Sequence, residues 1–490
     1  MKRTGGFRWV SVVAMIALVG TAACSGGPLP TAGGTASPGA TVADLPSSGA
    51  SSSPEVDAKT GKTKKGPKKG SPAGTSQEHT TGTTVSASGE TVSNEEQAER
   101  SRKLAKGLPP VNLWPEATAQ MGFTDDKIVF CSHAALTFAQ VFDTRIEDLN
   151  IYWEMVNASG GIYGRRVEMT YEDDAYRPDQ AVTAAEACKA KNPFILFGGI
   201  GFDQIPAVRA WNEQSQNRLL YIHHMARQDL EKQYSFSFFP SVEQAGTFAA
   251  RWLMSAHSGD VIGAVWRQSE AWEPGHTTFK STLESAGLEL AADLPVQKDQ
   301  AVYTQQIAEL QSQNVETVFL WENALGATEF IAQAKRQDYH PTYVVFPFQL
   351  ETDTLQEDSL DPPMEGVAFW PPYAPGVRGG PYAPYTDEII KFEAAINEYA
   401  TADEGNDILF MTWLAYKQMH QLLLDCGPDC DRNRLVALMI SGRHKAVSPN
   451  CPFDFTANGH VAGLTGNIFK AIDVDGYGAA WAPFKTCVRI

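Results

Sequence analysis

The stretch from Asn157 to Asp174 constrains the fold more than any other part of the chain. It reads Asn-Ala-Ser-Gly-Gly-Ile-Tyr-Gly-Arg-Arg-Val-Glu-Met-Thr-Tyr-Glu-Asp-Asp. Apolar residues at helical spacing precede it over 138–156, and its Asn and paired Gly tolerate the left-handed conformation that ends a helix. Apolar and polar residues then alternate over 167–171 as in a half-buried strand, and a short apolar run covers 127–131. This order predicts a strand–helix–strand unit of a parallel sheet.

The same alternation continues and predicts two similar α/β lobes, each a parallel sheet flanked by helices. In the first series we expect strands at 127–131, 167–171, 194–197, 219–222 and 235–239, and helices at 138–156, 180–188 and 205–215. In the second we expect strands at 261–266, 317–320 and 342–346, and helices at 244–255, 276–285, 304–313 and 327–336. The stretch 362–384, dense in Pro, Gly and aromatic residues, indicates an irregular crossing before helices at 386–399 and 407–424.

The N-terminus has the pattern of a secretory signal. Lys2, Arg3 and Arg8 precede a short apolar run over 9–20, which is too short to span a bilayer comfortably, and Thr-Ala-Ala-Cys follows at 21–24. Residues 1–23 resemble a bacterial lipoprotein signal peptide. The resemblance implies that Cys24 becomes the lipidated first residue and that the membrane is a partner. Ordinary secretion with cleavage nearby is the alternative.

Residues 24–107 are expected to form a disordered linker. They are rich in Gly, Ser, Thr and Pro and contain a lysine-rich run over 59–69, and such a composition buries too little apolar surface to fold. The lysine run is interpreted as solvated linker rather than as a contact with anionic lipid or wall polymer. The formal net charge of the whole chain is −17, which argues against nucleic acid as a partner, because phosphates require a basic surface.

Six cysteines remain after Cys24, an even number that suits disulfides in an oxidising compartment. Cys426 and Cys430 flank a short turn, and Cys451 and Cys487 flank the last Gly-rich segment, so each pair is placed to form a disulfide. Cys131 is expected at the far end of a strand and Cys188 late in an antiparallel helix, which argues against their pairing. Zinc is not expected, because ligand spacings such as Cys-x-x-Cys are missing.

The run Asn-x-x-Gly-Gly-Ile-x-Gly-Arg followed by a strand and Glu-Asp-Asp resembles the first unit of the Leu/Ile/Val-binding-protein family. Further similarities are Phe-Gly-Gly-Ile-Gly at 197–201 and Phe-Pro-Ser-Val-Glu-Gln at 239–244, and the resemblance covers about 122–490. Members are substrate-binding proteins of ABC importers with the type I periplasmic-binding fold, two Rossmann-like lobes joined by a hinge. The resemblance implies a first lobe from 108–243 and 371–447, and a second from 244–370 and 448–490.

Ligands of α/β sheets lie beyond the carboxyl ends of the strands, so the loops there supply the candidate site. The resemblance implies carboxylate-binding positions near Gly201-Phe202 and Ala226-Arg227, an ammonium-binding position near Gln349 and an aromatic clamp at Trp272. The hydroxyls and the acid that would bind a plain branched-chain amino acid are missing there, so a ligand with an apolar or planar face is expected. The candidate ligand-binding residues are Ser132, His133, Gly201, Phe202, Asp203, His224, Ala226, Arg227, Trp272, Trp321, Asn323 and Gln349.

No catalytic set, cofactor or metal is expected. The chain has no Gly-x-Ser-x-Gly, His-Glu-x-x-His or P-loop motif. Adjacent His223 and His224 would point to opposite faces of a strand, and Glu172-Asp173-Asp174 lacks EF-hand spacing. The resemblance implies a small-molecule ligand, an ABC permease as partner and an extracytoplasmic location at the outer face of the membrane. A ligand-sensing receptor without a transporter and, behind it, a hydrolytic enzyme are the alternatives.

Overall fold

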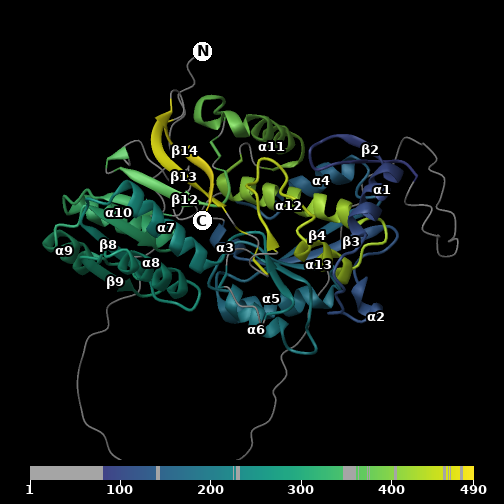
Figure 1. Cartoon of the computed structure of the whole chain (residues 1–490), viewed down its shortest axis with the longest axis horizontal. Coiled ribbons are helices and arrows are strands. Elements are labelled where there is room, and N and C mark those ends of the chain that lie inside the picture. Colours follow the sequence, from purple (N-terminus) through teal and green to yellow (C-terminus); the bar gives the residue numbers. More distant parts are fainter. Residues whose placement is uncertain are drawn as a thin grey trace, which may run out of the picture. The chain divides into compact units, whose positions relative to one another are not determined.

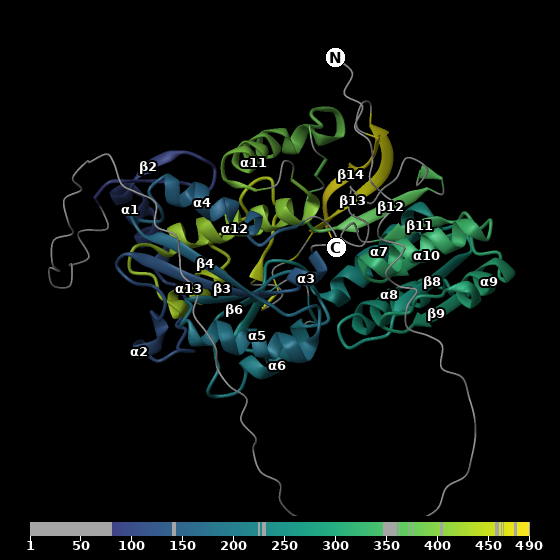
Figure 2. The same ribbon diagram turned by 180° about the vertical axis from the view of Figure 1, so that it is seen from behind.

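The first lobe is built on a sheet of five parallel strands in the order β4-β3-β5-β6-β7. Helices cover both of its faces, α5 and α6 on one side and α4 and α12 on the other (Figures 1 and 2). These are the elements of a computed structural model that describes residues 81–139, 144–223, 226–227, 232–345, 360–361, 363–371, 373–374, 376–401, 405–455, 460–461, 463, 465–474 and 478–489. The first-lobe elements up to the crossing are α2 (Glu116–Ala119), β3 (Lys127–Ala134), α3 (Leu136–Ala139), the short 3-10 helix η3 (Asp148–Asn150), α4 (Ile151–Ala158), β4 (Arg166–Asp173), α5 (Pro178–Ala190), β5 (Ile195–Gly198), α6 (Ile205–Asn212), β6 (Tyr221–His223) and β7 (Ser235–Ser237).

The second lobe contains a seven-stranded sheet in the order β14-β13-β12-β11-β10-β8-β9. Strands β8 to β12 are parallel, whereas β13 and β14 form an antiparallel pair at one edge. The elements are α7 (Val242–Ala256), β8 (Ile262–Arg267), α8 (Glu273–Ser285), β9 (Ala292–Val296), α9 (Thr304–Ser312), β10 (Thr317–Trp321), α10 (Ala324–Arg336), β11 (Thr342–Val345), β12 (Met364–Ala368), β13 (Thr465–Val474) and β14 (Gly478–Arg489). The prediction of two α/β lobes is confirmed.

Several elements were not anticipated. Strands β9, β12, β13 and β14 lie outside the expected strands, and β12 falls inside the stretch expected to be an irregular crossing. The expected helix over 138–156 is also wrong as a single element. It is divided into α3, η3 and α4. The buried Asp148, the first residue of η3, accepts hydrogen bonds from the backbone N–H and hydroxyl of Thr401.

The chain returns to the first lobe after β12. The segment forms the 3-10 helix η7 (Gly380–Tyr385) and helices α11 (Thr386–Tyr399), α12 (Asp407–Cys426) and α13 (Arg432–Ile440). Helices α11 and α12 pack on α4, and Tyr152 of α4 hydrogen-bonds His420 of α12 at 3.0 Å. The final hairpin β13–β14 then pairs with β12 of the second sheet. The expected lobe boundaries remain predictions.

The expected boundary of the linker at residue 107 lies too late in the sequence. Residues from 81 onward form a short hairpin of β1 (Thr83–Val85) and β2 (Thr91–Ser93) and a helix α1 (Asn94–Ala105). Helix α1 packs on α12, with Ala98 and Ser101 buried in the contact face. Sequence composition missed it because this face consists of small and polar residues instead of an apolar stripe.

All three pairs of the remaining cysteines form disulfides, with Cα–Cα distances of 5.3 or 5.4 Å. The pairs Cys426–Cys430 and Cys451–Cys487 are confirmed. The argument against Cys131–Cys188 is wrong, because β3 continues to Ala134 and so places Cys131 in the middle of the strand, beneath α5.

The segment that enters the second lobe carries well-defined local signals. Ser241 and Gln244 form a capping box at the start of α7, in which the Ser241 hydroxyl accepts from the Gln244 N–H and the Gln244 side chain accepts from the Ser241 N–H. Pro240 packs closely against Gly463, where a Cβ atom would lie 2.1 Å from the proline ring. The strand end at Ser237 also bridges to Val461, so two segments that are distant in sequence run together at the crossing.

Candidate functional site

A buried ionic cluster joins the carboxyl ends of strands from both lobes. Asp203 lies in the loop after β5 of the first lobe and is 8% exposed. Its Oδ2 accepts from Arg267 Nη2 at 2.8 Å, and its Oδ1 accepts from Ser269 Oγ and from Trp272 Nε1, each at 3.0 Å. All three donors belong to the second lobe, so the Asp203 carboxylate links the two lobes.

Arg267, the last residue of β8, is the centre of this cluster. Its side chain is 1% exposed, and its Nη1 donates to Glu322 Oε1 at 2.9 Å. Glu322 directly follows β10. Burial disfavours the charged guanidinium, but Asp203 and Glu322 together raise the pKa of Arg267 above its ordinary value. Burial raises the pKa of Glu322, while Arg267 and the Asn323 N–H counteract that rise. The arginine is therefore held as a cation between two acids.

Aromatic side chains surround the ionic cluster. Trp272 and Trp321 meet edge to face with ring centroids 5.1 Å apart, and Trp321 Nε1 donates to the Trp272 carbonyl at 2.7 Å. Phe202, from the first lobe, lies 5.5 Å from the Trp272 ring. Tyr176 has its pKa raised by burial and by the charge of Asp203, so its hydroxyl stays protonated. The site combines one cation and its two acidic partners with a large apolar surface.

A second buried network lies within the first lobe. His133 at the end of β3 contacts Asp174 Oδ2 through Nδ1 at 2.8 Å and the Tyr221 hydroxyl through Nε2 at 2.7 Å. Asp174 Oδ1 also accepts from Gln204 Nε2 at 2.8 Å, in the same loop as Asp203. This network fixes the loop that presents Asp203.

The predicted ligand-binding residues fall into separate groups. Asp203, Phe202, Trp272 and Trp321 come together, and Asn323 lies beside them as the N-cap of α10, accepting from the Gly326 N–H. The buried Ser132 hydroxyl donates to the carbonyl of His133. The Arg227 side chain is 67% exposed and lies 3.8 Å from Glu243. Gly201 adopts φ 116° in the loop before Asp203, and the carbonyl of Ala226 accepts from the Val242 N–H. His224 and Gln349 lie outside the described residues, and ligand contact remains a prediction for the whole set.

Sequence reasoning missed Arg267, Ser269 and Glu322. The strand was expected to end at Trp266, and Arg267 was not named among the candidate ligand-binding residues. A usable signal is present, because Arg267 and Glu322 are charged residues that directly follow apolar strand runs. At the carboxyl ends of neighbouring parallel strands, such residues face one another.

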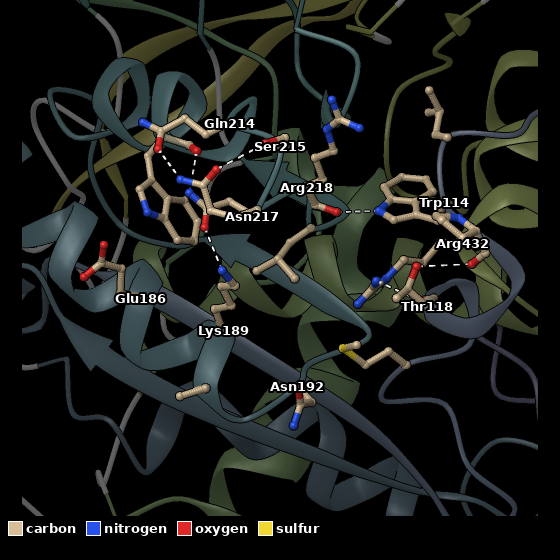
Figure 3. Close-up of a pocket in the computed structure, with 17 residues that line it drawn as sticks. Trp114, Thr118, Glu186, Lys189, Asn192, Gln214, Ser215, Asn217, Arg218 and Arg432 are labelled. Carbon is tan, nitrogen blue, oxygen red and sulfur yellow. Dashed lines mark hydrogen bonds between the residues drawn. The ribbon is translucent and has the colours of Figure 1, made fainter.

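A sizeable cavity in the described part of the chain lies elsewhere. It has a volume of about 770 Å³ and is lined by residues that precede β3, β5 and β6, together with Arg432 of α13 (Figure 3). It therefore opens at the amino ends of these strands, opposite the loop of Asp203. Two of its basic residues, Lys189 and Arg432, are bound to the protein itself: Lys189 donates to Asn217, and Arg432 donates to three backbone carbonyls. These contacts support a packing role for the cavity walls.

The described part of the chain offers neither a cluster of His, Cys, Asp and Glu suited to a metal ion nor a helix long and apolar enough to cross a bilayer.

Comparisons with known proteins agree with this architecture. The family model described as "Periplasmic binding protein" matches residues 149–474. No curated protein matches the sequence. A fatty acid ABC transporter substrate-binding protein from Thermomonospora curvata is similar in structure, with a TM-score of 0.60, 18% identity and coverage of 75% of this chain and 94% of that one.

Two further solved structures share the fold. The solute-binding protein of an ABC transporter from R. palustris, in complex with 4-hydroxybenzoate, has a TM-score of 0.58 and 13% identity, covering 74% of this chain and 98% of that one. A possible leucine/isoleucine/valine-binding protein from Rhodopirellula baltica has a TM-score of 0.60 and 12% identity, covering 74% of this chain and 96% of that one.

The chain belongs to the periplasmic binding protein family, because the family model covers about two thirds of it. Its fold is the type I periplasmic-binding fold, as expected from the resemblance of the Asn157–Asp174 stretch. Membership places the protein outside the cytoplasm and among proteins that bind small molecules.

Proposed function

We propose that the protein is a lipid-anchored, extracytoplasmic solute-binding protein that captures a small molecule between its two lobes and delivers it to an ABC importer. The observation that carries the proposal is the cluster around Arg267, where loops from both lobes meet at the carboxyl ends of their strands. Binding sites of α/β proteins form at this edge. Contacts from one solute to both lobes would stabilise the closed, solute-bound state.

The chemistry of the site favours an amino-acid-like, amide or aromatic solute. Trp272 and Phe202 supply flat apolar surface, and Arg267 supplies one fixed charge. The ligands named for the similar structures, a fatty acid and 4-hydroxybenzoate, also combine an apolar body with a polar end. Trp272 is almost fully buried in the present arrangement, so a solute would reach it after the lobes separate.

Anchoring through Cys24 completes the proposal. A lipidated N-terminus followed by a long Gly/Ser/Thr-rich segment would keep the binding lobes near a membrane permease. Growth with labelled palmitate tests this part: label should enter the wild-type protein and be absent from the Cys24→Ala variant. Label in both proteins, or in neither, would contradict anchoring at this residue.

Solute binding is tested by thermal shift on the full chain with amino acids, amides, aromatic acids, fatty acids, sugars and polyamines. A ligand that binds the folded state raises the melting temperature by mass action, about 2.7 kcal/mol of stabilisation at a hundredfold excess over Kd. One class of solute should raise it, and Trp272→Ala should abolish the rise. If no compound raises the melting temperature, the proposed importer role is wrong and a receptor for a macromolecular partner becomes the better hypothesis.

A further inference from the structure

The Asp203 carboxylate occupies a site built entirely by the opposite lobe. Both of its oxygens are bound, one by Arg267 and the other by Ser269 and Trp272. These donors lie close together in sequence, at the end of β8 and in the turn leading into α8. We refer to Arg267, Ser269 and Trp272 as the carboxylate cradle.

The carboxylate cradle is positioned by contacts within its own lobe. Glu322 holds the second terminal nitrogen of Arg267 at 2.9 Å, and Trp321 Nε1 binds the carbonyl of Trp272 at 2.7 Å. The Trp321 ring also packs on Gly275, where a Cβ atom would come within 2.7 Å of it. The donors therefore keep their arrangement when Asp203 leaves, which reduces the cost of binding another carboxylate.

Asp203 has the opposite character. Among the described residues, the hydrogen bonds of its carboxylate all go to the second lobe. Separation of the lobes exposes the acid and the carboxylate cradle to water at the same time. A carboxylate that enters from solution can then take the place of Asp203.

The donors also define which solutes fit. The guanidinium of Arg267 and the indole N–H of Trp272 only donate hydrogen bonds. An ammonium group would oppose donor to donor, and an amide offers these donors only one neutral oxygen. A carboxylate accepts from both donors and takes over the charge pairing that Asp203 makes with Arg267, while Glu322 keeps its own bond to the same guanidinium. Phe202 and Trp272 provide an apolar wall beside this position.

We propose that Arg267, Ser269 and Trp272 form the carboxylate-binding subsite for the solute, and that Asp203 occupies this subsite when no solute is bound. The inference rests on the proposed solute-binding function and narrows its ligand to monocarboxylates with an apolar body. Asp203 is then a built-in competitor. The apparent affinity for a solute is lowered by the fraction of molecules in which Asp203 fills the subsite.

The test compares matched acids and amides in the full chain. Binding of benzoate, octanoate, benzamide and octanamide is measured by calorimetry with the wild type, Asp203→Ala and the control Asp293→Ala. Asp293 is a suitable control because it accepts from Trp266, His276 and Lys280, all within the second lobe. Asp203→Ala should tighten binding of an acid at least tenfold and leave the amides unchanged, while the control resembles wild type.

A milder variant keeps the test independent of folding defects. Ser269→Ala removes one donor from the cradle, so in the Asp203→Ala background it should weaken acid binding several-fold without affecting amides. Equal affinity for an acid in the wild type and Asp203→Ala, or preference for the amide, would overturn the carboxylate subsite while leaving solute binding intact. If no compound of the broad thermal-shift screen binds any variant, the proposed function itself fails together with the inference.

Discussion

The disulfide between Cys131 and Cys188 should contribute more stability than the one between Cys426 and Cys430, although all four cysteines are fully buried. The reason is loop length. The first disulfide joins residues 57 apart and the second residues 4 apart. The chain-entropy relation gives about 4 kcal/mol for the longer loop and about 2 kcal/mol for the shorter one.

The two pairs form a matched comparison because both belong to the first lobe. Cys131 lies in β3 and Cys188 in α5, while Cys426 ends α12, which packs on α4. Replacing either pair by alanine removes two buried sulfur atoms, so the packing losses largely cancel when the two variants are compared. The remaining difference of about 2 kcal/mol reflects the unfolded chain.

The assay is urea unfolding of the wild type and the two double-alanine variants, followed by far-UV circular dichroism. The Cys131→Ala/Cys188→Ala variant should unfold at a clearly lower urea concentration than Cys426→Ala/Cys430→Ala, and a larger slope with urea is expected for both variants because their unfolded states are more expanded. Equal midpoints, or greater loss from the short loop, would refute the entropic reasoning. Such a result would mean that local packing around α12 dominates.

Three further predictions concern the core. Gly246→Ala should destabilise the protein by about 1–3 kcal/mol in urea unfolding, because its Cβ atom would lie 2.0 Å from the Gly275 carbonyl where α7 and α8 cross; Gly259→Ala, with open space around it, should be neutral. Burial lowers the pKa of His420 from 6.5 to about 3. Below about pH 6.5 the unfolded chain therefore binds a proton at His420 that the folded protein does not bind, and the free energy of unfolding falls. A His420→Leu variant should lose this part of the pH dependence, measured by urea unfolding. Arg432→Met removes the arginine donor from the buried carbonyls of Pro193 and Phe194 and from the part-buried carbonyl of Thr118, which keeps the Met121 N–H. The change should cost about 3 kcal/mol in the same assay, whereas a loss below about 1 kcal/mol would contradict this account.

Much of the fold follows from local sequence patterns. Buried parallel strands such as β5 and β10 are short apolar runs, and the helices between them carry apolar stripes, so period and length identify them. Strand β9 was not predicted because it lies at the edge of the sheet and contains Asp293 and Pro295, residue types that are rare in strands. The hairpin β13–β14 was missed because its partner β12 lies about a hundred residues earlier in the chain.

Only part of the candidate site could be predicted from local sequence patterns. Loops after strands predicted Asp203 and Trp272 separately, since strand ends are visible in the sequence. Their contact depends on how two lobes face each other, which no local pattern encodes. The position of Arg267 directly after an apolar strand run marks it only as a candidate, because an isolated arginine after a strand is common on protein surfaces. Its burial and its two acidic partners in the structure single it out.

The carboxylate cradle leads to a final prediction about motion. Charge-assisted hydrogen bonds contribute about 1.5–3 kcal/mol each, so the bonds to Asp203 are sufficient to favour closed lobes before any solute arrives. A solute carboxylate would replace one closed arrangement with another. Small-angle scattering should therefore show little change when octanoate or benzoate is added to the wild type. Asp203→Ala should increase the radius of gyration, and the acid, unlike its amide, should restore it. An unchanged radius in Asp203→Ala would show that the segments around Pro240 and Gly463 hold the lobes closed without the ionic cluster.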